Sequence, residues 1–137
     1  MNLQRRIDLL TRLGEWMKTE ELSWIEAKKK ATMENGWFIP EFVELATKNV
    51  ADQFLPKQIL ENWAKKYQIP EKQQHSKNIG IVMAGNIPLV GFHDLLATFI
   101  SGHKTMIKPS SKDSVLVKHL VEKLQEWDPR VNDLVQF

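Results

Sequence analysis

Cysteine is absent from the 137 residues of this chain. Without thiols the chain can form neither disulfide bonds nor the thiolate ligands of a structural zinc site. It also has no run of about 18 apolar residues, the length that a membrane span requires, and its first residues lack the apolar segment of a signal peptide. We therefore expect a cytoplasmic protein with no membrane span.

Neither sign of charge is in clear excess, since 19 Lys and Arg face 17 Asp and Glu for a net charge of +2. Proteins that bind nucleic acid concentrate positive charge on one surface, so we expect no nucleic-acid partner. The sequence also predicts no metal site, because His103 and His119 lie far apart and have no carboxylate at ligand spacing.

The composition is that of a folded globular protein, with 42% hydrophobic and 26% charged residues. Residues 1–77 carry apolar residues at the three- and four-residue spacing of helices, whereas residues 78–137 alternate short apolar runs with helical patterns. The polar stretch 68–77, which contains Pro70, marks a linker between the two parts. We therefore expect a helical N-terminal segment, 1–77, followed by an α/β domain, 78–137.

Four helices are expected in the N-terminal segment. The first covers residues 3–17. The second can start at Thr19 or at Ser23, which stands three residues before Glu26 as in a capping box. Pro40 and Pro56 suit the starts of the third and fourth helices. The residues that we expect to face the core from the second and third helices are Leu22, Ile25, Phe42, Val43, Leu45, Ala46, Val50 and Phe54, with Trp24 as a further candidate.

The second part of the chain predicts strands that alternate with helices. Residues 79–84 form a short apolar run typical of a buried strand, and residues 85–88 form a tight loop. A crossover helix between two strands makes them parallel neighbours. The remaining expected elements are a helix from Pro88 to Gly102, a strand at 103–108, a helix after Asp113 and a third strand from Leu134.

Two loops follow the first and second strands, at residues 85–88 and 108–112. Open α/β sheets bind ligands at the carboxyl ends of their strands, so these loops favour a nucleotide or another phosphate-bearing ligand. The chain contains neither G-x-G-x-x-G nor G-x-x-x-x-G-K-S/T. Both common phosphate-binding fingerprints are therefore missing.

The two loops nevertheless carry a resemblance to a known family. Gly85-Asn86-Ile87-Pro88 stands where aldehyde dehydrogenases have Trp-Asn-Phe-Pro, and Lys108-Pro109-Ser110-Ser111 stands where they have Lys-Pro-Ser-Glu. In the helical segment, Trp37-Phe38-Ile39-Pro40-Glu41 is similar to the acyl-CoA reductase branch of that superfamily, the fatty-acyl reductases related to those of bacterial bioluminescence. The implied fold class is α/β: a helical segment followed by the first βαβα(β) units of an incomplete, Rossmann-like dinucleotide-binding domain of the aldehyde dehydrogenase type.

The resemblance implies a catalytic role for Asn86. In the family this amide donates a hydrogen bond to the oxyanion that forms when a cysteine attacks the acyl carbonyl, and a preorganised donor of this kind contributes roughly 10² to 10³ in rate. The alternative is that Asn86 supports the turn with its own side chain, as Asn often does. The neighbouring His93 and Asp94 do not form a catalytic dyad, because adjacent helical residues do not face each other.

The resemblance also implies a cofactor site. Lys108 inherits contact with the adenosine ribose, and Ala84, Gly85 and Ser110 lie at matching cofactor positions. Ser111 replaces the glutamate that binds both ribose hydroxyls of NAD. Since a hydroxyl beside Lys108 and Lys112 accepts a 2′-phosphate that a carboxylate would repel, we expect NADP, with NAD as the alternative.

The expected chemistry lacks its nucleophile. In the family an acyl-CoA is reduced to an aldehyde through a cysteine thioester, but this chain has no cysteine, and Ser110 and Ser111 have no base within reach in sequence. We therefore expect the N-terminal portion of an NADP-dependent acyl-CoA reductase, truncated and inactive in isolation, with acyl-CoA as the substrate of the full-length enzyme. The alternative is a non-catalytic module whose helices bind a partner and whose α/β part is a scaffold.

An incomplete parallel sheet also predicts self-association. Two complete strands and a third that begins at Leu134 leave an unpaired edge, which is a template for another chain. We therefore expect a homo-oligomer, most simply a two-fold dimer, because closed symmetry avoids open-ended growth.

Overall fold

The computed structural model describes all residues from 1 to 137. It contains six α-helices, one short 3-10 helix (η1) and three strands, and none of the helices combines the length and apolar character of a membrane span. In chain order the elements are α1 (Leu3–Met17), α2 (Leu22–Glu34), α3 (Pro40–Gln53), α4 (Lys57–Lys66), β1 (Asn78–Val82), α5 (Phe92–Ser101), β2 (Lys104–Lys108), α6 (Val115–Trp127), η1 (Pro129–Asp133) and β3 (Val135–Gln136).

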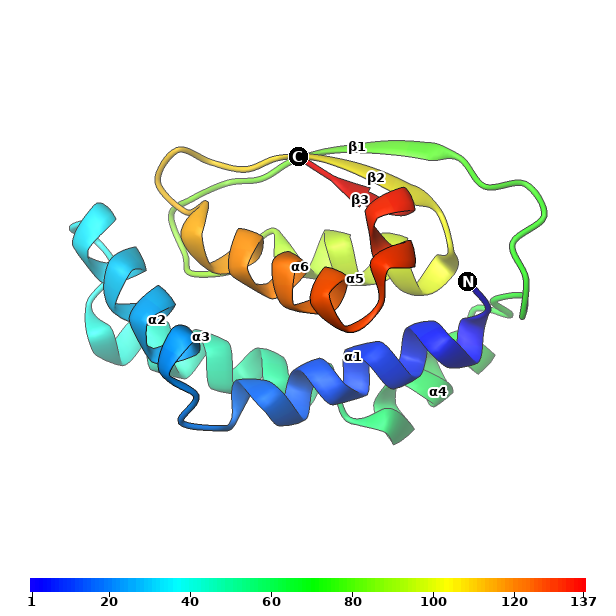
Figure 1. The fold of residues 1–137 in the computed structure, drawn as a ribbon, viewed down its shortest axis with the longest axis horizontal. Helices are drawn as coiled ribbons and strands as arrows, with labels where there is room; N and C mark the ends of the chain where they lie inside the picture. The colour runs from blue at the N-terminus through cyan, green and yellow to red at the C-terminus, as the bar shows by residue number, and fades with distance from the viewer.

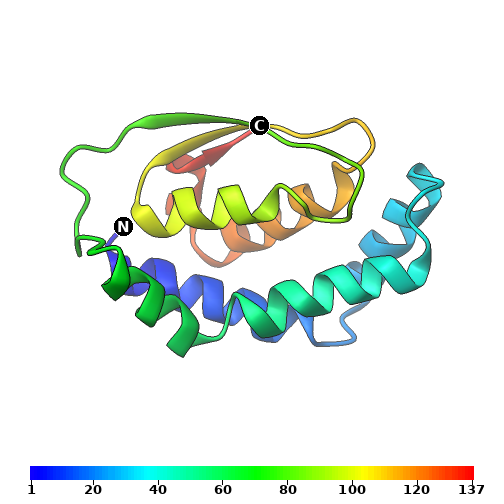
Figure 2. The same ribbon diagram turned by 180° about the vertical axis from the view of Figure 1, so that it is seen from behind.

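The elements form three layers, with the sheet on one side, α5 and α6 in the middle and α1 to α4 on the other side (Figures 1 and 2). The sheet is parallel in the order β1-β2-β3, and Ile81 pairs with Ile107 while Thr105 pairs with Val135. The predicted parallel strands are therefore confirmed. Because both crossovers are expected to be right-handed and step in the same direction, they place α5 and α6 on one face of the sheet.

The other face of the sheet carries no helix (Figures 1 and 2). Along β1 the side chains alternate, so that Ile81 is buried against α5 while Val82 on the outer face is 79% exposed. Met106 and Lys108 of β2 also lie on this outer face. The prediction of a fully buried first strand is therefore wrong. The continuous apolar run at residues 79–84 is typical of a strand that is covered on both faces, but helices cover only one face of this sheet.

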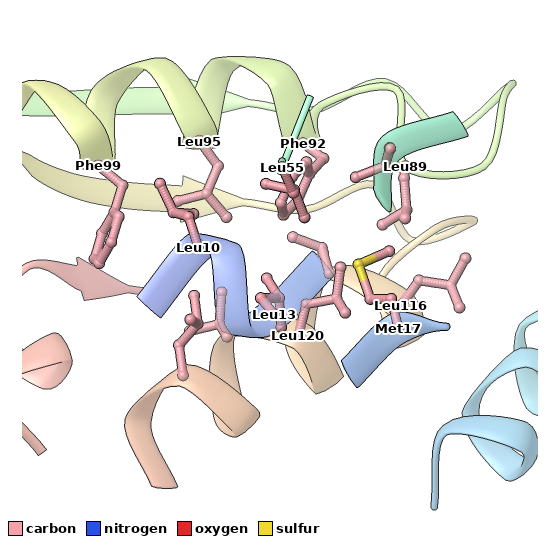
Figure 3. Close-up of a cluster of buried hydrophobic side chains, with 14 of the residues drawn as sticks. Leu10, Leu13, Met17, Leu55, Leu89, Phe92, Leu95, Phe99, Leu116 and Leu120 are labelled. Atoms are coloured by element: carbon pink, nitrogen blue, oxygen red, sulfur yellow. The ribbon is translucent and has the colours of Figure 1, made fainter. Parts of the chain in front are cut away.

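A single hydrophobic core joins the helical segment to the α/β part. Helix α1 packs against α5 and α6, and Leu55 of the α3 to α4 connection joins the same cluster beside Phe92 (Figure 3). Gly14 allows this packing, because a Cβ on it would lie 2.7 Å from the Cβ of Leu55. The labelled members of the core are Leu10, Leu13, Met17, Leu55, Leu89, Phe92, Leu95, Phe99, Leu116 and Leu120.

Several predicted helix ends are confirmed. Pro40 begins α3, Pro56 caps the start of α4, and Gly102 caps the end of α5. The predicted third strand is also confirmed at β3, where the N–H of Thr105 donates to the carbonyl oxygen of Leu134 at 2.7 Å. The 3-10 turn that precedes β3 was not expected.

The start and orientation of α2 differ from the prediction. The helix begins at Leu22 rather than at Thr19 or Ser23, and the Ser23 hydroxyl donates to the carboxylate of Glu21 at 2.8 Å instead of capping the backbone. Leu22 is 67% exposed, although we expected it to face the core. Trp24 fills that place instead, fully buried with its indole N–H donating to the carbonyl oxygen of Met17 at 3.0 Å.

Helix α3 buries a narrower stripe than its sequence predicts. Val43 and Val50 are buried against α1 and α2, but Phe42 and Leu45 are 55% and 57% exposed. The prediction that both face the core is wrong, because they lie on the side of α3 that borders the loop containing Asn86.

Candidate functional site

The two loops that the sequence singles out lie against each other at the carboxyl ends of β1 and β2. The N–H of Met83 donates to the carbonyl oxygen of Lys108 at 3.0 Å, which extends the strand pairing to the first residues of the loops. A Cβ on Gly85 would lie 2.2 Å from the hydroxyl oxygen of Ser110. Glycine at position 85 therefore permits a contact between the loops that any larger residue would prevent.

A third segment, at the end of α2, ties the two loops together. The side-chain amide of Asn35 donates to the carbonyl oxygens of Gly85, at 3.2 Å, and Lys112, at 3.0 Å. Its oxygen accepts from the N–H of Trp37 at 3.0 Å. Asn35 is 4% exposed, so its amide makes both of its donor contacts inside the protein. Helical periodicity indicates only that α2 ends near this residue, and no sequence pattern predicts its contacts with both loops.

Asp113 joins the second loop to the segment before α5. One carboxylate oxygen, Oδ2, accepts from the N–H of Leu89 at 2.8 Å, whereas Oδ1 is buried without a hydrogen-bond partner. Burial raises the pKa of Asp113 to about 6, against the lowering effect of the hydrogen bond from Leu89. The sequence predicts only that a helix follows Asp113, and no sequence pattern indicates its contact with Leu89.

The contact with Asp113 explains why α5 starts late. Leu89 has a φ of +59°, which is outside the helical region, and its N–H is held by Asp113. The chain therefore makes turns after Pro88, and α5 begins at Phe92. The prediction that the helix begins at Pro88 is wrong, because a tertiary hydrogen bond overrides the local preference. Such left-handed conformations cost about 1 to 2 kcal/mol for a residue with a side chain, and they persist where surrounding contacts fix them.

Asn86 is exposed at the tip of the first loop, and its side chain forms no hydrogen bond within the protein. The alternative role, in which the Asn86 side chain supports the turn, would need a hydrogen bond within the loop, and the structure contains none. Asn86 lines a groove of about 570 Å³ between this loop and α3. Its amide is free to donate to a ligand in that groove, and the oxyanion role stays a prediction.

The residues of the second loop have different surroundings. Ser110 accepts from the N–H of Lys112 at 3.2 Å and contacts Gly85, so it belongs to the loop junction. The ammonium of Lys112 lies 5.5 Å from the ring centroid of Trp37. The side chains of Ser111 and Lys108 are exposed, and neither side chain has a hydrogen-bond or ion-pair partner in the protein. Of the two lysines expected to flank Ser111 in the site, Lys108 is the one whose ammonium forms no ion pair and no cation–π contact.

These groups suit an anionic ligand. An ammonium and a hydroxyl without partners can both donate to phosphate or ribose oxygens, and the segment 108–112 contains no carboxylate. Ala84, two residues after the end of β1, is exposed at the same edge of the sheet. The arrangement is that of an α/β protein with a candidate nucleotide site at the carboxyl ends of adjacent parallel strands.

Comparison with known proteins identifies the family. The sequence model of the family described as acyl-CoA reductase (LuxC) matches residues 16–136, a range that includes both loops and Asn35. The chain belongs to this family, which confirms the resemblance drawn from the loop sequences. Searches of curated proteins and of solved structures gave no significant match.

Proposed function

We propose that these residues supply the oxyanion donor and part of the cofactor site of an NADP-dependent acyl-CoA reductase, within an aldehyde-dehydrogenase-like dinucleotide-binding domain. The observation that carries the proposal is the junction of the two loops. In a chain of this family, the free amide of Asn86 and the free groups of Lys108 and Ser111 lie on loops that Asn35 fixes to each other.

Asn86 would act on the acyl carbonyl. When a thiolate adds to the thioester of an acyl-CoA, negative charge develops on the carbonyl oxygen before the CoA thiolate leaves. An amide donor that is already in position stabilises that charge without reorganising, which is typically a gain of about 10² to 10³ in rate. When bound, reduced NADP would supply the hydride that converts the acyl group, held as a thioester after CoA leaves, into the aldehyde.

Lys108 and Ser111 would hold the adenosine end of the cofactor. The ammonium of Lys108 attracts the phosphate and ribose oxygens, and the neutral hydroxyl of Ser111 tolerates a 2′-phosphate. A carboxylate at position 111 would repel that phosphate and favour NAD. The proposal therefore places the choice between the two cofactors mainly at Ser111.

The covalent step requires a group that these residues do not contain. The sequence has no cysteine, and Ser110 is engaged by the N–H of Lys112 rather than by a base. A serine without a base is a poor nucleophile. The proposal therefore assigns no nucleophile among these 137 residues, and we expect no turnover from them alone.

A second function is favoured by the exposed apolar side chains near the first loop. Trp37, Phe42 and Leu45 are all more than half exposed, and apolar surface of this kind often marks a protein interface. In this alternative the helices bind a protein partner, the α/β part is a scaffold, and no nucleotide binds. Cofactor binding separates the two functions.

The test is to titrate the chain with NADPH and, separately, with NADH. Binding is measured through energy transfer from tryptophan to the reduced nicotinamide. We expect saturable binding of NADPH. Ser111→Glu should weaken NADPH by about tenfold or more, equivalent to roughly 1.4 kcal/mol, and NADH much less. Lys108→Met should weaken both.

Two control variants match these changes. Lys104→Met removes a lysine from the same face of β2 at its opposite end, and Gln58→Glu adds a carboxylate on α4. Neither should change binding. If neither nucleotide binds, the cofactor site is rejected and the interaction module is favoured. If Ser111→Glu lowers the affinities for NADPH and NADH equally, Ser111 does not face the 2′ position.

A further inference from the structure

The first loop is anchored at both of its ends and has no hydrogen bond between them. At one end, the carbonyl oxygen of Gly85 accepts from the side-chain amide of Asn35 at 3.2 Å. At the other end, the N–H of Leu89 donates to the carboxylate of Asp113 at 2.8 Å. Asn86 lies between these anchors, and neither its backbone nor its side chain forms a hydrogen bond within the protein. The position of Asn86 therefore depends on where the anchors hold the loop.

Asp113 belongs to both loops. Its backbone N–H donates to the carbonyl oxygen of Ser110 at 3.2 Å, which closes the turn of the second loop, while its side chain reaches the first loop at Leu89. Asp113 is 6% exposed, and its Oδ1 atom has no partner. Because burying a carboxylate with an unpaired oxygen is unfavourable, the fold maintains this contact although the contact lowers its stability.

The anchor holds residues 88–91 in a conformation that their sequence disfavours. Pro88 suits the first position of a helix, and the sequence predicts that α5 begins there. Leu89 instead has a φ of +59°, a left-handed conformation that residues with a side chain disfavour, and α5 begins at Phe92. The segment thus has two arrangements, the observed turn and a helix extended back to Pro88. The contact with Asp113 belongs to the observed turn.

We propose that Asp113 is a positioning residue for Asn86, which it keeps at the junction of the two loops by holding residues 88–91 out of α5. The inference rests on the proposed function, because that function gives the Asn86 amide its task. An amide donor stabilises an oxyanion best when it is in place before the charge develops. Asn86 has no contact of its own that would hold it there, and an α5 extended to Pro88 would redirect it.

The charge of Asp113 makes the anchor sensitive to pH. Burial raises the pKa of Asp113 to about 6, and the hydrogen bond from Leu89 is the only opposing cause. In the released arrangement the carboxylate meets water, and its pKa returns toward the ordinary value of 3.8. The anchored loop therefore binds more protons, so rising pH favours release. No charged group contributes to the raised pKa, although the ends of the surrounding elements carry Glu34, His93, Asp94, Lys108, Lys112 and Lys118.

Hydrogen exchange at the Leu89 amide measures the release directly, because release exposes this N–H to water. With pKa values of about 6 and 3.8, the ratio of anchored to released loop should fall about tenfold between pH 5 and pH 7.5. The protection factor of Leu89, corrected for the intrinsic exchange rate, should fall by the same factor. Asp113→Asn is neutral at every pH and can still accept from Leu89, so its protection should stay constant.

Removing the acceptor tests the positioning of Asn86. In Asp113→Ala, the Leu89 amide should lose more protection than the amide of Leu120, which is buried in α6. The one-bond Cα–Hα coupling of Leu89 should change to that of a negative φ, and the side-chain amide resonances of Asn86 should shift. Asp113→Asn should restore the wild-type values. Asp133→Ala removes an exposed carboxylate from η1 and should change none of them.

The outcomes separate this inference from the proposed function, because NADPH titrated into the same samples reports the cofactor site independently. Release of Leu89 in Asp113→Ala without NADPH binding to the wild type would support the anchor and reject the cofactor site. Equal losses of protection at Leu89 and Leu120, or Asn86 resonances that stay in place when Leu89 is released, would overturn the inference even if NADPH binds. Should Asp113→Ala not fold, the pH profile decides: a constant ratio of protection between wild type and Asp113→Asn would overturn it.

Discussion

The buried amide of Asn35 donates a hydrogen bond to the carbonyl oxygen of Gly85 at 3.2 Å, although the two residues are 50 positions apart in the chain. Its second N–H reaches the carbonyl oxygen of Lys112 at 3.0 Å. One side chain at the end of α2 thus sets the spacing between the loops that carry Asn86 and Ser111. The helical segment is part of the site's framework rather than a separate attachment.

Replacing Asn35 should therefore destabilise the whole chain. Asn35→Ala removes the donor from two partly buried carbonyl oxygens, and the loss for each is at most the roughly 1 to 3 kcal/mol that a fully buried unsatisfied group costs. Urea unfolding measures the change. Asn132→Ala is the control, because Asn132 is exposed and donates only to the nearby carbonyl oxygen of Pro129. Equal losses in the two variants would mean that the contacts of Asn35 with the loops add nothing.

Asp113 should make stability depend on pH in the direction opposite to that of a salt-bridged carboxylate. Its pKa is about 6 in the folded chain, against 3.8 as the ordinary value. Between these values the folded state holds more protons than the unfolded state, so the free energy of unfolding falls as pH rises. The full effect is at most about 3 kcal/mol.

The measurement compares wild type with Asp113→Asn, whose amide oxygen can still accept from Leu89, across pH 4 to 7. Relative to this variant, the wild type should lose stability as pH rises through that range. A constant difference would show that the Asp113 carboxylate is not buried as described, and a difference of opposite sign would show that a cation stabilises it.

The sequence predicted what depends on local pattern. Proline positions located the starts of α3 and α4, and the length of the crossover predicted the parallel pairing of β1 with β2. The loop motifs predicted the family. Each of these features depends on the identity of a few neighbouring residues in the sequence.

The features that the sequence did not predict depend on contacts between distant segments. Leu89 leaves the helical region because Asp113 holds its N–H, and Asn35 is buried because two loops close over it. Apolar pattern also could not tell which face of a helix or strand has a neighbour, so Phe42 and Val82 were expected to be buried but are exposed.

The uncovered face of the sheet predicts self-association. Val82, Met106 and Phe137 are exposed on or beside it, and β1 has a free edge because β2 is its sole partner. We propose that a second copy covers this surface, so light scattering at micromolar concentration should give more than the monomer mass of 16.0 kDa. Val82→Lys with Met106→Lys should restore the monomer. A wild-type monomer would reject this proposal.

The most direct test of the proposed function is to map NADPH onto the chain by NMR, through the backbone amide shifts of a uniformly labelled sample. We predict saturable shifts at Gly85 and Asn86 in the first loop and at Lys108 and Ser111 in the second, with the amides of α4 unchanged. Ser111→Glu should move the midpoint of these shifts to about tenfold higher NADPH or more and leave the midpoint with NADH nearly unchanged. Shifts confined to the helical layer, or no shifts at millimolar NADPH, would contradict a cofactor site at the junction of the two loops.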